Sequence, residues 1–167
     1  MVRLDLDRIN KNSPYSVIST NDSSCYKFVT DYNINYAVSF LEDELLLNCE
    51  SYQFIIANTN NKKSPRDPKL RLSIMAIIHE FFESTKAALL YICETGDSRQ
   101  SMRNRLFEFW FNSSPRKSEF IFISANIEDA EGVQNYVAII SRLDNPQLKE
   151  VVSEFTETMQ LFSQKPT

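Results

Sequence analysis

The sequence is short of glycine and histidine, and each shortage excludes a class of site. Only Gly96 and Gly132 occur among 167 residues, whereas phosphate-binding loops and the Gly-x-Ser-x-Gly nucleophile turn need two or more glycines close together. His79 is the one histidine, so a single chain cannot build a multi-histidine metal centre. The chain therefore carries none of the common nucleotide loops and no α/β-hydrolase nucleophile turn.

Cysteine and long apolar runs are also scarce. The three cysteines, Cys25, Cys49 and Cys93, form no Cys-x-x-Cys pair, which argues against a disulfide framework or a zinc knuckle. Cys93 closes an apolar run, so we expect a small buried side chain there. No apolar stretch approaches the length of about 20 residues that a membrane span needs, and the N-terminus lacks a signal-peptide run. We therefore expect a cytoplasmic protein with no membrane partner.

The charge balance is modestly acidic. The chain has 18 Lys and Arg against 22 Asp and Glu, a formal net charge of −4. Nucleic-acid binding normally leaves a basic footprint, so we do not expect a nucleic-acid partner. The length and the 43% hydrophobic content suit one globular domain. We expect it to span residues 1–167, with an ordered core from about 14 to about 163.

Strands dominate the predictions for the first half of the chain. Segment 15–20 is rich in β-branched and aromatic residues, and apolar and polar residues alternate in segments 26–30, 36–40 and 52–56. Both features are typical of strands. Turn-forming residues at 31–35 separate the second and third segments, as in a hairpin. The first half therefore predicts an antiparallel meander.

A helix follows the meander. Asp67 and Pro68 are typical of a helix start. One apolar stripe comes next at helical spacing: Leu70, Ile74, Ile77, Ile78, Phe81 and Phe82. This stripe predicts a helix with one buried face.

Strands and helices alternate through the second half. The apolar runs 87–93 and 120–124 and the segment 133–140, which follows a turn at Gly132, predict strands. A second helix begins at Asp97, and a last one begins at Asn145-Pro146. Its expected buried residues are Leu148, Val151, Val152, Phe155, Met159 and Phe162.

The predicted fold class is α+β, in the order ββββ-α-β-α-ββ-α. The N-terminal meander continues into a mixed central sheet that is packed by three helices. The strand at 87–93 lies between two helices in the sequence, so we expect it inside the sheet and at least partly parallel to a neighbour.

The strongest candidate site is the turn and helix start after that strand. A helix start attracts anions, and Arg99 and Arg103 lie on one face, where guanidinium groups can bind phosphate or carboxylate. The expected binding residues of this segment are Thr95, Gly96, Ser98, Arg99, Arg103 and Arg105. The alternative is structural: Asp97 caps the helix, and the arginines form surface ion pairs with acidic neighbours such as residues 42–44.

Large aromatic residues crowd the same helix at Phe107, Phe109, Trp110 and Phe111. Successive helix residues diverge by about 100°, so these rings cannot all face one core. Either this end of the helix is buried on two sides, or it exposes a patch that marks a partner surface. Trp and Arg dominate interface hot spots, so Trp110 joins the candidate binding residues.

Other candidates are weaker. His79 lies mid-helix with no nucleophile identifiable near it. The acidic run 42–44 suits a metal or a basic partner, but more often it is a solvated strand end. The basic cluster 61–66 is too short to indicate nucleic-acid binding. We identify no catalytic residue, no metal site and no cofactor.

Part of the chain resembles a known family. The stretch LLYICETGD at 89–97, the stretch RNRLF at 103–107 and Trp110-Phe111 are similar to an uncharacterised family of small cytoplasmic proteins from Bacteroides-type bacteria. The resemblance covers about residues 14 to 125 and belongs to a domain of unknown function. It implies no activity, cofactor or substrate, and it suggests an accessory protein that binds other proteins.

Two functions remain open from the sequence. The first is a non-enzymatic module that binds a protein partner or itself through the arginine and aromatic helix. The second is a small-ligand or nucleotide-phosphate binding protein, with or without enzymatic activity, that uses the Gly96 turn and the helix start after it. The missing catalytic set favours the first.

Overall fold

The computed structural model describes residues 3–43, 45–46, 48–63, 65–94, 107–128 and 130–163. Its helices are α1 (Leu6–Asn12), α2 (Pro68–Ser84), the 3-10 turn η1 (Lys117–Glu119) and α4 (Leu148–Ser163), and residues 107–112 are also helical. Its strands are β1 (Ile18–Ser19), β2 (Cys25–Val29), β3 (Asn35–Glu42), β4 (Ser51–Asn58), β5 (Ala88–Glu94), β6 (Phe120–Glu128) and β7 (Gln134–Arg142).

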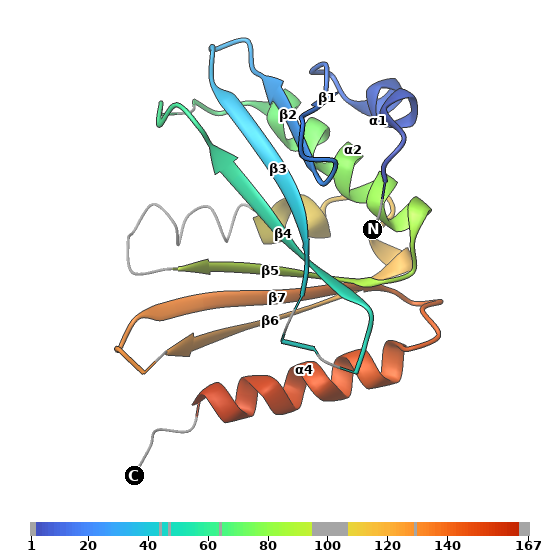
Figure 1. Ribbon diagram of the computed structural model, residues 1–167, viewed down its shortest axis with the longest axis vertical. Coiled ribbons are helices and arrows are strands. Elements are labelled where there is room, and N and C mark those ends of the chain that lie inside the picture. Colours follow the sequence, from blue (N-terminus) through green and yellow to red (C-terminus); the bar gives the residue numbers. More distant parts are fainter. Residues whose placement is uncertain are drawn as a thin grey trace. The chain divides into compact units, whose positions relative to one another are not determined.

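The strands form a seven-stranded mixed sheet in the order β1-β2-β3-β4-β5-β7-β6 (Figure 1). The predicted α+β class and the interior position of β5 are confirmed. β5 pairs antiparallel with β7, and β7 pairs antiparallel with β6. The prediction that 120–124 is a buried strand needs correction, because β6 is an edge strand with Ile121, Phe122 and Ile123 half-buried.

The chain forms two compact units, and neither is one continuous segment. The first contains Met1–Leu41 and Phe54–Thr85, and the second contains Glu42–Gln53 and Lys86–Thr167. The chain passes from one unit to the other within β3 and β4. A single domain over residues 1–167 stays a prediction.

The first unit packs α2 against the aromatic face of the meander. The predicted stripe of α2 is buried along its whole length, and Phe81 stacks on Phe40 of β3 with ring centroids 4.9 Å apart. Asp67 caps α2 by accepting a hydrogen bond from the Lys69 N–H at 3.0 Å. This helix was therefore correctly predicted in both its start and its buried face.

Helix α1 of the first unit was not predicted. Asp5 caps it through the N–H groups of Asp7 and Arg8, and Ile9 is buried with 1% exposure. The Arg8 guanidinium donates to the buried Glu80 carboxylate of α2 at 2.7 Å. The order of elements thus begins with a helix, and the packed region extends N-terminal of residue 14.

In the second unit, helices pack on both faces of strands β5, β7 and β6. One face carries Leu90, Val137, Ile139 and Ile127, and it packs against Val151, Phe155 and Met159 of α4. The opposite face carries Tyr91, Phe122 and Tyr136, and it meets the helix at 107–112 through aromatic rings. Alternation along each strand sends neighbouring side chains to opposite faces, which separates these two layers.

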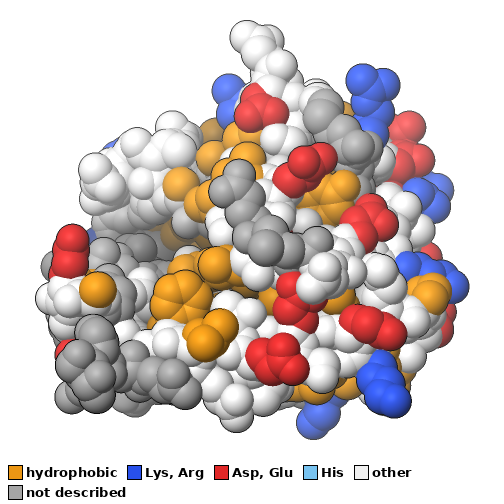
Figure 2. Space-filling view, turned by 60° about the horizontal axis from the view of Figure 1, so that its bottom comes forward, with side chains coloured by type: hydrophobic (Ala, Val, Ile, Leu, Met, Phe, Trp, Pro, Cys, Tyr) orange, Lys and Arg blue, Asp and Glu red, His pale blue; other side chains and the backbone are white. Residues whose placement is uncertain are grey.

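Helix α4 begins two residues later than its predicted start. Asn145 still caps this end, because its side-chain oxygen accepts from the Gln147 N–H at 2.9 Å. The prediction that Phe162 is buried is wrong: Phe162 is 45% exposed, and the neighbouring Leu161 is 69% exposed. Figure 2 turns the lower side of Figure 1 forward and shows acidic side chains between separate hydrophobic ones on this face.

Candidate functional site

The predicted binding residues divide into two groups. Six of them lie outside the described residues: Thr95, Gly96, Ser98, Arg99, Arg103 and Arg105. The anion site at the Gly96 turn therefore stays a prediction, as does the burial of the Cys93 side chain. Trp110 lies within the described part, on the helix at 107–112, and that helix carries the site described below.

Two rings of this helix anchor it to the sheet. Phe107 is 2% exposed and stacks on Tyr91 of β5, with ring centroids 4.7 Å apart. Phe111 is 1% exposed and packs against Phe120 and Phe122 of β6 at 5.7 and 5.2 Å. The two anchors are four residues apart and so lie on one helix face.

The other two rings are less completely buried than these anchors. Phe109 is 60% exposed, and Trp110 is half-buried. Of the two arrangements that the sequence left open, the structure has the exposed aromatic surface. We call Phe109 and Trp110 the aromatic surface.

A polar cluster lies on the sheet side of the same helix. The Glu108 carboxylate oxygen Oε1 accepts from the Tyr136 hydroxyl at 2.5 Å and from the Ser124 hydroxyl at 2.7 Å. Burial and the bond to Glu108 both raise the pKa of Tyr136, so this phenol is a proton donor that holds the carboxylate in place. The cluster fixes the helix to β6 and β7 by polar contacts as well as by aromatic packing.

The sequence analysis missed this cluster. Ser124 is 16 residues from Glu108, and Tyr136 is 28 residues from it. The spacing of these three residues in the sequence does not indicate the cluster. They come together because β6 pairs with β7 and because the helix at 107–112 packs on these strands. The only available signal was a polar side chain at the end of the apolar run 120–123.

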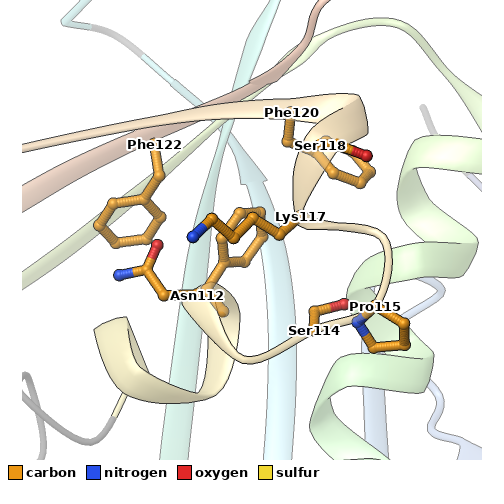
Figure 3. A pocket seen from close by; sticks show the side chains of 8 residues that line it. Asn112, Ser114, Pro115, Lys117, Ser118, Phe120 and Phe122 are labelled. Atoms are coloured by element: carbon orange, nitrogen blue, oxygen red, sulfur yellow. The ribbon is translucent and has the colours of Figure 1, made fainter.

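A hollow of about 540 Å³ opens beside the helix end. Phe111, Phe120 and Phe122 form its apolar part, and Figure 3 shows the Lys117 ammonium reaching toward Asn112 and Phe122. Asn112 and Lys117 are exposed, so the hollow does not enclose a ligand as typical small-molecule sites do.

Among the weaker candidates, the acidic run has a structural role. Asp43 of the acidic run accepts from the Leu46 N–H at 2.8 Å and from the Ser51 hydroxyl at 3.0 Å, so it organises the turn between β3 and β4. His79 is half-buried on α2. Within the described ranges, no group of three or more His, Cys, Asp or Glu residues is placed to hold a metal ion.

The fold and the site define a class of protein: an α+β protein with an exposed aromatic helix surface. The chain belongs to the family of unknown function DUF6169, whose model matches residues 66–157. The match runs from the start of α2 into α4, so it begins later and ends later than the range of about 14 to 125 expected from the resemblance. The uncharacterised nature of the family is confirmed.

Comparison with the curated proteins gave no match. In the part of the chain that the structure describes, no helix combines the length and the apolar character needed to cross a bilayer.

Proposed function

We propose that this protein is a non-enzymatic interaction module of the bacterial cytoplasm. It binds a protein partner, or a second copy, through the aromatic surface together with Arg99, Arg103 and Arg105, which precede that surface in the sequence. The observation that supports the proposal is the 60% exposure of Phe109 beside the half-buried Trp110. Exposed aromatic area is favourably removed from water, at about 25 cal/mol per Å².

The rigid seating of this helix supports the same function. Phe107 and Phe111 hold it by packing, and Glu108 holds it through the Tyr136 and Ser124 hydroxyls. A surface on a fixed helix loses little conformational freedom on binding. Aromatic and arginine side chains supply most interface hot spots, and this segment contains both.

Site-specific photo-crosslinking tests the proposal. A photoreactive phenylalanine analogue at Phe109, expressed in the source cells, should give a covalent adduct with a specific protein. The same analogue at Leu143, which is 50% exposed, should not give this adduct. The captured protein, once purified, should shift the emission of Trp110, which is the only tryptophan.

The Phe109→Ser variant provides the decisive comparison. It should fold with unchanged stability, within about 0.5 kcal/mol, because the side chain is exposed. It should nevertheless lose the adduct partner and the Trp110 emission shift. Unchanged partner binding by Phe109→Ser, or equal adducts from positions 109 and 143, would show that the aromatic surface is not the interface.

A further inference from the structure

The outer edge of β6 has no strand partner in the described structure. β6 is the last strand in the sheet order and pairs with β7. Between Ile121 and Ile127, no described segment hydrogen-bonds to the backbone along the other edge. Alternate N–H and C=O groups there are consequently available to another strand.

This edge lacks the features that usually prevent strand addition. β6 is nine residues long, and its run FIFISANI at 120–127 contains no charged residue and no proline. Natural sheets protect their edges with charges, proline, bulges or very short strands. At the opposite end of the order, β1 has only two residues, which is the short-strand form of protection. The two ends of the sheet therefore differ in their capacity to pair.

The side chains along the edge are also incompletely covered. Ile121, Phe122, Ile123 and Ala125 are each half-buried. A strand added beside β6 would place its own side chains next to these on both faces of the sheet. The edge thus offers main-chain hydrogen bonds together with apolar area.

The charges that flank β6 favour one occupant and one orientation. Arg116 and Lys117 precede the strand, Glu128 is its last residue, and Asp129 and Glu131 follow it in the sequence. Arg116 is already paired with Glu119 at 2.7 Å, whereas the exposed Lys117 makes no ion pair with any described residue. Two antiparallel copies would bring the basic flank of each next to the acidic flank of the other. A parallel pair would set like charges together.

We propose that β6 pairs antiparallel with β6 of a second copy to form a continuous sheet across a twofold axis. Twofold symmetry of this kind requires paired residues to be an even number of positions apart, so that both copies present the same side-chain face. A pairing centred on Ile123 meets this condition. It sets Lys117 of each copy opposite position 129 of the other, so the basic flank of each copy meets the acidic end that contains Glu128, and symmetry supplies this meeting of flanks twice.

Charge exchange tests the pairing directly. Sedimentation of the full chain between about 1 and about 500 µM should show a monomer–dimer equilibrium. Lys117→Glu alone and Glu128→Lys alone should each weaken self-association by about tenfold, since like charges then meet at both ends of the pairing. A mixture of the two variants should form the heterodimer with the original affinity, because every contact is then attractive. Matched control variants on α4, Lys149→Glu and Glu157→Lys, should dimerise like the original protein.

Amide hydrogen exchange locates the interface independently of charge. Amides of β6 on the outer edge should become protected as the protein concentration rises, and those of β1 should not. A monomer at every concentration would overturn the proposal. The proposal would also be overturned if both single variants dimerised like the original protein. A dimer whose formation did not change the hydrogen exchange of the β6 amides would overturn it as well.

The β6 pairing depends on the strand edge and its flanking charges and not on the Phe109 side chain, so the two proposals can fail independently. Phe109→Ser should leave the sedimentation behaviour of the β6 dimer unchanged. Lys117→Glu should leave crosslinking through position 109 unchanged.

Discussion

The Tyr15→Phe substitution tests how the first unit holds the start of α2. The Tyr15 hydroxyl donates to Asp67 Oδ2 at 2.6 Å, and both residues are buried. The other carboxylate oxygen of Asp67 accepts from the Lys69 N–H and caps the helix. Phenylalanine keeps the ring stacked on Phe28 but leaves a buried carboxylate oxygen without this donor.

The expected loss of stability follows from the charged acceptor. A hydrogen bond to a charged group contributes about 1.5–3 kcal/mol. Because the ring packing is retained, no cavity term is added. Tyr15→Phe should therefore lower the free energy of unfolding by about 1.5–3 kcal/mol at pH 7.

The same contact makes the loss depend on pH. Burial and the hydrogen bond to Asp67 raise the pKa of Tyr15 to about 12, whereas an unfolded tyrosine titrates near 10. The folded state therefore binds the proton more tightly. This contribution is complete below about pH 10 and is lost as the pH rises toward 12. The stability difference between the original protein and Tyr15→Phe should shrink over that interval.

Urea unfolding from pH 7 to pH 11.5 measures both effects. Tyr32→Phe makes the same chemical change at a side chain that is 51% exposed, so it should be neutral throughout. An equal loss in both variants, or a difference for Tyr15→Phe that stays constant above pH 10, would refute the role of the Tyr15–Asp67 bond.

Two further substitutions examine other carboxylate contacts by urea unfolding at pH 7. Arg8→Met should cost about 1.5–3 kcal/mol, because the Glu80 side chain, only 5% exposed, loses a guanidinium at 2.7 Å; a cost below about 0.5 kcal/mol would show that α1 is held by Ile9 instead. Tyr136→Phe should cost about 1–2 kcal/mol, because Glu108 loses its Tyr136 donor and keeps its Ser124 donor; it should also lower the protection of amides 107–112 against exchange, and unchanged protection would contradict the anchoring role of the cluster.

Elements whose signals lie within a few residues were predictable from the sequence. The cap and buried stripe of α2 and the hairpin of β2 and β3 depend on local spacing, and they form as expected. Helix α1 escaped prediction because it has only seven residues, too few for a stable isolated helix. Its stability comes from the burial of Ile9 and from Glu80, which is 72 residues away from Arg8. The capping Asp5 was its one local signal.

The candidate site was predictable only where the helix alone determines it. The four rings at 107, 109, 110 and 111 cannot share one helix face, so partial exposure of some of them follows from helix geometry. Which rings are exposed depends on where Tyr91 and Phe122 lie, and this is set by the pairing of β5, β7 and β6. The Glu108 cluster depends on the same pairing.

Local composition does not distinguish an interior strand from an edge strand. The runs LLYI in β5 and FIFI in β6 are equally apolar, yet β5 lies between two strands and β6 ends the sheet. The β6 segment is distinguished by the charged residues that flank it. The β6 segment is basic at its start and acidic at its end. In an antiparallel pair, the basic start of each copy lies next to the acidic end of the other, so the charges attract at both ends. An uncharged edge with such flanks is therefore better explained by pairing between copies than by burial within one chain.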